Sequence, residues 1–376
     1  MGAVWRRPLV SLALLGALLT GCSHHSPRRD ATPTSRTGGS EGPTTSTMPG
    51  PPSTLMGSWF SSDHDGWAVS REPCPQPGVN DQATCAVVWK TADSGASWTR
   101  LARLDVPPDN GVGPDSVRAV RFADAQRGWV FNRSLYATFN GGKRWQPVDL
   151  GNPVVALEST SSQMYALVAA CGNGAGNCPS PMRIYEGTVS TGRWRFVAPG
   201  FDLPNTDKGT LVPTKGGLYA VVSDYGSNQM FLARTATGRW ERRTPPCLRP
   251  IVAPIAGDEG LVAACLPATP GGPVELQTSS DGGRSWAVVW QYNFRAAVTS
   301  LAVTGQAAVV GLENGDLLRT ADNGMHFVPA LRAGVNPALQ FVDGTHGFFT
   351  AGPDGSRALF RTADGGTTWT AVPPPG

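Results

Sequence analysis

One phrase recurs seven times along this chain, and its spacing constrains the fold more than any other feature. The last copy reads RTADGGTTW and ends at Trp369, and the first reads KTADSGASW and ends at Trp98. An aromatic residue closes every copy, and the successive aromatic positions are 47, 49, 46, 46, 41 and 42 residues apart. A period of this length, in a chain with 46 Gly and 33 Pro, indicates a series of small β-sheets joined by turns.

The copies share one chemical pattern, although they differ in completeness. Three carry Ser/Thr-x-Asp-x-Gly-x-x-Trp, one has Asn for Asp, one has Phe for Trp and two are shortened. An Asp followed two positions later by Gly is typical of a tight turn, in which the carboxylate accepts backbone N–H bonds and Gly adopts a positive φ. The aromatic residue beyond it suits packing between sheets. The copies span residues 91–98, 138–145, 188–194, 235–240, 279–286, 320–327 and 362–369, and the residues expected to form these turns are Asp93, Gly95, Trp98, Asn140, Gly142, Trp145, Trp194, Trp240, Asp281, Gly283, Trp286, Asp322, Gly324, Phe327, Asp364, Gly366 and Trp369.

Four strands fit into each repeat. In the second repeat they are expected at 117–124, 127–132, 134–139 and 145–150. Residues 55–376 therefore predict an all-β fold, a seven-bladed β-propeller of four-stranded antiparallel blades with about 46 residues per blade. The first repeat already has four strands of its own, so closure of the ring by a shared strand and closure by packing alone both remain open.

The repeated turns resemble the Asp-box, or BNR repeat, of sialidases, sortilin-type receptors and Ycf48-like assembly factors. The resemblance covers nearly the whole of residues 55–376, and its motifs specify a fold rather than a partner. Seven blades and an export signal resemble the Ycf48-like group more closely than the six-bladed sialidases. This resemblance implies a non-catalytic binding or assembly scaffold for a protein or glycan partner, with no partner-binding residue that can be carried over by motif.

A glycoside hydrolase, exo-sialidase-like or of another family, is the alternative. The nearest match to the Arg-Ile-Pro signature of sialidases is MRIYE at residues 182–186, which lacks the Pro and lies in the third repeat. Glycosidases of other Asp-box families need two carboxylates across a cleft. Nothing in the sequence selects such a pair among the candidates near first strands, which are Asp63, Asp65, Asp115, Glu158 and Asp202.

Two sets of basic residues are candidates for contact with an anion. Arg118 and Arg121 lie three positions apart in a predicted first strand, so a regular strand cannot turn both toward a central channel. A surface position is the alternative for each of them. The second set precedes the box Thr in four copies and should form a partial ring near the box face, where its members either pair with local carboxylates or contact an anionic polymer: Lys90, Arg234, Arg319 and Arg361.

The N-terminus predicts export and lipidation. Arg6 and Arg7 precede a short apolar stretch, residues 8–20, which is too short to cross a bilayer. It ends in Leu19-Thr20-Gly21-Cys22, which resembles the lipobox of bacterial lipoproteins. That resemblance implies removal of the signal peptide 1–21 and a lipid on Cys22. The lipid would anchor the protein in the cell envelope at the outer face of the bacterial plasma membrane, which is the periplasmic side in a cell with an outer membrane. The remainder of 22–54 is rich in Ser, Thr, Pro and Gly and predicts a disordered linker.

The cysteines fit an oxidising compartment. Seven is an odd number, and lipidation of Cys22 leaves six for disulfides. Their positions relative to the predicted strands favour three local pairs on the face opposite the box turns: Cys74–Cys85, Cys171–Cys178 and Cys247–Cys265. These pairs would pin the longer loops, either as protection against proteolysis or as a rigid interaction surface.

Composition narrows the partners further. The formal net charge is only +3, so a near-neutral protein gives no reason to expect nucleic acid as its partner. The sequence predicts neither a cofactor nor a metal site, and we expect a monomer.

Overall fold

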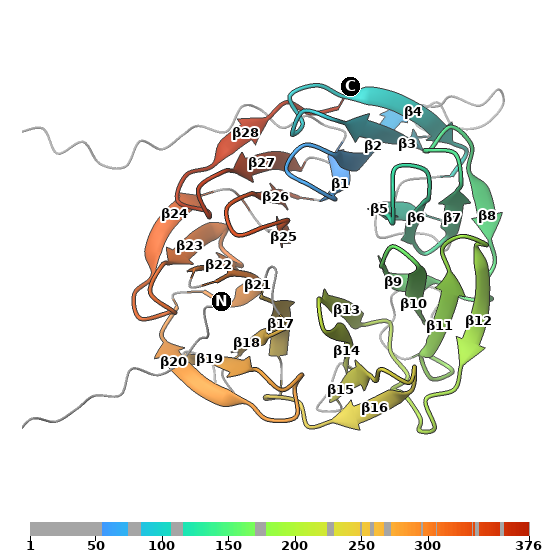
Figure 1. Ribbon diagram of the computed structural model, residues 1–376. Coiled ribbons are helices and arrows are strands. Elements are labelled where there is room, and N and C mark those ends of the chain that lie inside the picture. Colours follow the sequence, from blue (N-terminus) through green and yellow to red (C-terminus); the bar gives the residue numbers. More distant parts are fainter. Residues whose placement is uncertain are drawn as a thin grey trace, which may run out of the picture.

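The computed structural model describes residues 55–375, apart from residues 74–83, 107–115, 170–177, 224–228, 249, 256–258, 267–271, 295, 306, 333, 335–337 and 354–356. Within this part of the chain, 28 strands form seven four-stranded antiparallel sheets. The sheets are arranged around a ring as the blades of a propeller (Figure 1). This architecture confirms the fold class predicted from the repeat.

Each blade takes four consecutive strands, which we number as blades 1 to 7 in chain order. Blades 1 to 3 contain β1 (Leu55–Phe60), β2 (Gly66–Pro73), β3 (Thr84–Thr91) and β4 (Thr99–Leu104); β5 (Val117–Phe122), β6 (Gly128–Asn132), β7 (Leu135–Thr138) and β8 (Gln146–Val148); and β9 (Val154–Ser159), β10 (Gln163–Val168), β11 (Arg183–Thr188) and β12 (Arg193–Val197). Blades 4 and 5 contain β13 (Gly209–Thr214), β14 (Gly217–Ser223), β15 (Gln229–Arg234) and β16 (Trp240–Arg243); and β17 (Pro250–Pro254), β18 (Leu261–Cys265), β19 (Val274–Ser279) and β20 (Ala287–Tyr292). Blades 6 and 7 contain β21 (Val298–Thr304), β22 (Ala307–Leu312), β23 (Asp316–Thr320) and β24 (Val328–Arg332); and β25 (Ala338–Phe341), β26 (Gly347–Ala351), β27 (Ala358–Thr362) and β28 (Thr370–Val372).

The first strand of every blade faces the centre of the ring and the fourth strand lies at its rim (Figure 1). Second strands have neighbouring blades on both faces, which explains why they read as apolar runs instead of alternating patterns. All five residues of β18 are buried, as are all five of β26. Box turns connect the third and fourth strands in each blade, so they all lie on one face, which we call the box face.

The core is divided into seven hydrophobic clusters, and each cluster lies between two adjacent blades. The last of them joins blade 1 to blade 7, through Leu55 and Phe60 on one side and Phe348 and Leu359 on the other. Packing between blades, repeated around the ring, therefore supplies the apolar burial that a single four-stranded sheet cannot supply alone.

A recurring Gly at the start of the second strand allows the first strand to close tightly over it. A Cβ atom on Gly66 would lie 2.3 Å from the ring of Phe60, and one on Gly128 would lie 2.6 Å from the ring of Phe122. These Gly residues thus make room for an aromatic ring that ends the inner strand. The Gly-aromatic dipeptides of the sequence reflect this packing.

The ring closes without a shared strand, because blade 1 and blade 7 are each complete sheets of consecutive strands. Side chains hold the junction together. The rings of Phe60 and Phe348 stack with centroids 3.5 Å apart, and Trp98 Nε1 donates a hydrogen bond of 3.0 Å to the carbonyl of Pro373. This observation decides the question of closure that the sequence left open.

Candidate functional site

The box turns form closed hydrogen-bond networks. In the first turn, Asp93 Oδ1 accepts bonds from the Thr91 hydroxyl (2.7 Å) and the Ser97 amide (2.8 Å), and Asp93 Oδ2 accepts one from the Ser97 hydroxyl (2.6 Å). The Gly95 amide donates to Thr91 Oγ1 at 2.8 Å. Bonds from the Ser97 hydroxyl, the Ser97 amide and the Thr91 hydroxyl lower the pKa of Asp93 to about 2. Because these oxygens are engaged within the turn, the carboxylate acts as a structural group.

The box Gly is held against the next blade. Gly95 has a φ of +83°, and a Cβ atom on it would lie 2.4 Å from Val372 of blade 7. Gly283 has a φ of +81°, and a Cβ atom there would lie 2.2 Å from the ring of Phe231 in blade 4. The turn therefore needs Gly for its backbone conformation and for the close approach of the adjacent blade.

A buried carboxylate lies between blades 3 and 4, the two blades whose shortened box turns lack the Asp. Glu186 of blade 3 is 1% exposed and accepts bonds from Arg234 Nε (2.7 Å), Arg195 Nη2 (2.8 Å) and Trp240 Nε1 (3.2 Å). Arg234 and Trp240 belong to blade 4, so Glu186 joins the two blades. The stretch MRIYE, which resembles a sialidase signature, ends in this residue, and Glu186 is buried in an inter-blade contact where no substrate can reach it.

The basic ring predicted at the box face is mostly paired. Lys90 lies 3.6 Å from Asp65 and above the ring of Trp67, and Arg234 is bound to Glu186. Arg319 donates to the carbonyl of Gly365 in the adjacent blade at 2.8 Å. The exception is Arg361, which forms no ion pair or hydrogen bond with any part of the chain that the structure describes. The structure therefore shows a carboxylate partner for two of the four and a backbone carbonyl partner for a third.

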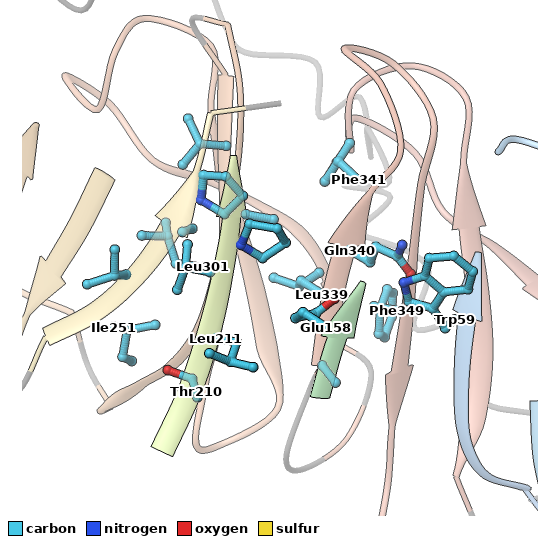
Figure 2. Close-up of a pocket in the computed structure, with 18 of the residues that line it drawn as sticks. Trp59, Glu158, Thr210, Leu211, Ile251, Leu301, Leu339, Gln340, Phe341 and Phe349 are labelled. Carbon is cyan, nitrogen blue, oxygen red and sulfur yellow. The ribbon is translucent and has the colours of Figure 1, made fainter. Parts of the chain in front are cut away.

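A central channel of about 700 Å³ runs between the inner strands of the blades. Figure 2 shows Leu211, Ile251 and Leu301 on one side of this channel and Trp59 and Gln340 on the other. The first side comes from blades 4, 5 and 6 and is mainly apolar, with Thr210, Lys215 and Thr299 among its polar residues. The second side comes from blades 7, 1, 2 and 3, and we call it the polar side because it holds Arg121, Glu158 and Gln340 beside apolar residues of blade 7.

The polar side is built from one repeated position. The next-to-last residue of the inner strand is Gln340 in blade 7, Trp59 in blade 1, Arg121 in blade 2 and Glu158 in blade 3. Arg121 Nε and Nη2 each lie 3.0 Å from Glu158 Oε1, and its guanidinium lies 6.0 Å from the centroid of Trp59. These residues line the channel, and Arg121 contacts the residues of both neighbouring blades, Trp59 and Glu158.

This polar position lies toward the box face. In blades 1 and 7 the turn that follows the inner strand is bonded to the box turn of the same blade, by the bond from the Ser94 amide to the His64 carbonyl (3.0 Å) and from the Gly365 amide to the Thr345 carbonyl (2.8 Å). The polar end of the channel thus opens on the face that carries the boxes. The sequence instead directed attention to the opposite face, whose long loops fall largely outside the described residues.

Of the two arginines proposed for the channel, Arg121 lines it and Arg118 does not. The register of β5 shifts between Val117 and Ala119, which places Arg118 in a β-bulge. This agrees with the expectation that both cannot face the channel. Arg121 is half-buried and its charge is compensated by Glu158.

Of the candidate catalytic carboxylates that the structure describes, Glu158 alone lines the channel. Asp65 pairs with Lys90, Asp63 lies 3.1 Å from His64 and Asp202 is exposed. Among the described residues that line the channel, Glu158 is the only acidic one. Asp115 lies outside the described residues.

Cys247 and Cys265 form a disulfide with a Cα–Cα distance of 5.7 Å. This is the local pairing expected from the sequence, and it ties the segment before β17 to the end of β18, away from the box face. Cys85 and Cys178 are also disulfide-bonded. Cys74 and Cys171, their expected partners, lie outside the described residues, as do Cys22 and the segments 1–21 and 22–54.

In the part of the chain that the structure describes, no group of three or more His, Cys, Asp and Glu side chains is placed to hold a metal ion. No helix in that part is long and apolar enough to cross a membrane.

Fold and turns together define the class: a seven-bladed β-propeller closed by packing between its first and last blades. No protein-family model matches the sequence, and no curated protein matches it significantly. Solved structures match in fold. YCF48 bound to D1 peptide aligns with a TM-score of 0.54 and 17% identity over 82% of this chain and 91% of that chain. YCF48 from Cyanidioschyzon merolae aligns with a TM-score of 0.53 and 14% identity, over 83% and 93%.

Other propellers are similar to the same degree. An ancestral GH74 enzyme gives a TM-score of 0.53 and 13% identity over 86% of this chain, which corresponds to 54% of the enzyme. The β-propeller domain of the Trilobed protease from Pyrococcus furiosus, described as having an open velcro topology, gives a TM-score of 0.54 and 8% identity over 85% and 95%. At these identities the similarity establishes the propeller fold and no specific activity.

Proposed function

We propose that this protein is a non-catalytic binding or assembly scaffold that acts outside the cytoplasm and is held at the membrane by a lipid on Cys22. The observation that carries the proposal is the state of Glu158. It is the one acidic residue among the described channel lining, and its Oε1 accepts two bonds from Arg121. General acid–base hydrolysis of a glycoside requires a second carboxylate across the cleft. A compensated ion pair beside an apolar surface instead suits recognition.

The shape of the channel favours a chain segment of a protein as the bound partner. A volume of about 700 Å³ accommodates several side chains, and the lining combines Leu211, Ile251 and Leu301 with the polar group around Arg121. A segment with alternating apolar and polar side chains would match both sides. YCF48, one structural neighbour, has been solved with a peptide bound, which supports a peptide-binding role for this propeller.

Site-specific photo-crosslinking in the native membrane tests this role. A crosslinking amino acid at Thr299, which is exposed and lines the channel, should capture one defined protein partner. The same group at Phe196, which is 53% exposed on the rim strand β12, serves as the matched control and should not capture it. Equal capture from both positions, or none from Thr299, would contradict a partner in the channel.

A hydrolysis assay with sialosides and other glycosides tests the alternative. The scaffold role predicts no turnover by the purified protein. Turnover that disappears in Glu158→Gln would establish a glycosidase and overturn the proposal. A glycan array distinguishes the remaining case, because selective sugar binding without turnover would identify a glycan partner in place of a protein.

A further inference from the structure

A second cavity, of about 380 Å³, lies on the box face at the junction where the ring closes. We call it the seam cavity. Blade 1 contributes Asp63, His64 and Ser94, and blade 7 contributes Phe348 together with polar residues of β27, β28 and the turns beside them. These polar residues include His346, Arg361, Thr362, Asp364, Thr368 and Thr370. Phe348, which stacks on Phe60, is buried.

Arg361 distinguishes this cavity from the equivalent positions in other blades. In β-sheet register, Arg361 pairs with Phe348 in blade 7 as Lys90 pairs with Trp67 in blade 1. Lys90 is neutralised by Asp65, the residue before Gly66. The matching residue before Gly347 is His346, so blade 7 has an imidazole where blade 1 has a carboxylate.

His346 is itself held by an acid outside the cavity lining. Its Nδ1 lies 2.8 Å from Asp343 Oδ2, and Asp343 does not line the cavity. Arg361 is exposed and forms no ion pair or hydrogen bond with the described residues. A guanidinium that lines a cavity and forms no ion pair is available to bind an anion.

Ser94 is a second, independent sign of function at this cavity. The residue between the box Asp and Gly has a positive φ in every complete turn, and it is Gly at positions 141, 282 and 365, with φ of 73°, 71° and 68°. Two turns carry another residue in this left-handed conformation, Ser94 with a φ of 61° and Asn323 of blade 6 with a φ of 60°. Asn tolerates a positive φ better than Ser does, so Ser94 is the more strained of the two. The Ser94 hydroxyl lies 3.4 Å from His64 Nδ1 and lines the cavity.

We propose that the seam cavity binds a carboxylate group, with Arg361 as the main ligand and the Ser94 hydroxyl as a further donor. The planar guanidinium matches the two oxygens of a carboxylate. Asp63 and Asp364 also line the cavity, and Asp364 is engaged with the hydroxyls of Thr362 and Thr368. Their negative charge favours a singly charged carboxylate over a doubly charged phosphate or sulfate.

Binding at this position would also strengthen the ring. The ligand would contact blade 1 through Ser94 and blade 7 through Arg361, so it would bridge the two ends of the propeller. Any ligand that binds the folded state alone raises the free energy of unfolding. The proposal therefore predicts that a bound carboxylate raises the thermal midpoint, a result that is independent of whether a partner occupies the channel.

Titration calorimetry on the full chain in detergent tests the assignment with N-acetylglycine and its neutral amide as matched probes. We expect the acid to bind and the amide not to bind. Arg361→Gln should weaken binding of the acid by at least about tenfold. Arg332→Gln, a change at an arginine that is 77% exposed on the rim of blade 6, should leave it unchanged. Equal affinity for acid and amide, or unchanged affinity in Arg361→Gln, would overturn the proposal.

Ser94→Gly separates function from folding, because Gly fits the backbone of this turn better than Ser. It should raise the thermal midpoint of the free protein and weaken binding of N-acetylglycine by a factor of about three or more. A variant that is more stable and binds equally well would remove Ser94 from the site.

Inorganic phosphate provides the charge test, since binding as tight as that of the acid would overturn the preference for a carboxylate. Among carboxylates, a peptide with one glutamate and glucuronate distinguish a protein source from a sugar source.

Discussion

The side-chain amide of Gln340 bonds both backbone groups of Phe60, a residue 280 positions earlier in the chain. Gln340 Oε1 accepts from the Phe60 amide at 3.1 Å, and Gln340 Nε2 donates to the Phe60 carbonyl at 2.6 Å. The amide thus occupies the place that a backbone peptide group would take in a continuous sheet. It joins blade 7 to blade 1 beside the channel, where the two ends of the propeller meet.

Replacement of Gln340 should weaken the closure of the ring. Gln340→Ala leaves the amide and carbonyl of Phe60 without their partners, and we expect the free energy of unfolding to fall by about 1–3 kcal/mol. Urea denaturation measures this free energy of unfolding. Gln291→Ala is the matched control, because Gln291 is exposed and bonds only Glu275, and it should change stability by less than about 0.5 kcal/mol. Equal losses in the two variants would show that the Gln340 amide does not hold the junction.

The parts of this fold that could be predicted are the parts that repeat. Seven copies of one turn carry a spacing signal, and they gave the blade number, the position of the box turns and the local pairing of Cys247 with Cys265. The Gln340 contact occurs once, between residues at opposite ends of the chain. A single long-range side-chain contact leaves no periodic trace, so nothing in the sequence marked it.

The candidate sites show the same division. Glu158 and Arg121 stood in the sequence as separate candidates, and their pairing in the channel required the blades to be placed in space. The seam cavity is different, because one signal was available. Comparison of the residue before the box Gly across the five complete copies leaves only two that are not Gly, Ser94 and Asn323, and Ser94 is the one at this cavity.

Loss of Glu186 should destabilise the junction of blades 3 and 4 more than loss of any exposed acid. Glu186→Ala leaves Arg234 half-buried without its partner, and removal of one member of a buried pair costs about 3–5 kcal/mol. We expect a loss near the lower end of that range, because Arg195 is largely exposed. Glu241→Ala, at a side chain that is 53% exposed and 3.6 Å from Arg243, should cost less than about 1 kcal/mol. Chemical denaturation measures the free energy of unfolding of both variants. Equal losses in the two would contradict the role of Glu186 at this junction.

Anchoring through Cys22 predicts a clear change in partitioning. Cys22→Ala should move the protein from the detergent phase to the aqueous phase in a phase-separation assay, because the lipid supplies the attachment. The thermal midpoint of the propeller should not change, since Cys22 precedes the described domain by more than 30 residues. Ser26→Ala is the matched control, because it changes a neighbouring linker position and should leave partitioning unaltered. Retention of Cys22→Ala in the detergent phase would disprove lipid attachment at this residue.

The box turns predict a defined acid dependence of stability. Hydrogen bonds from the Ser97 hydroxyl and amide and from Thr91 lower the pKa of Asp93 to about 2, whereas an unfolded Asp titrates near 3.9. The carboxylate therefore contributes its full stabilisation above about pH 4, where it is ionised in both states. Below that pH the unfolded chain takes up the proton first, and the contribution is lost as the pH falls to about 2.

Asp93→Asn isolates this contribution, because blade 2 already carries Asn140 in the same turn with bonds from Thr138 and Arg144. The variant should fold, be less stable than the wild type at pH 7 and approach the wild type as the pH falls from about 4 to about 2. Unfolding measured against pH gives the difference directly. Asp202→Asn, a change at an exposed residue outside the box turns, should differ little from the wild type at either pH. A gap between Asp93→Asn and the wild type that stayed constant down to pH 2 would mean that the stabilisation does not depend on the charge of Asp93.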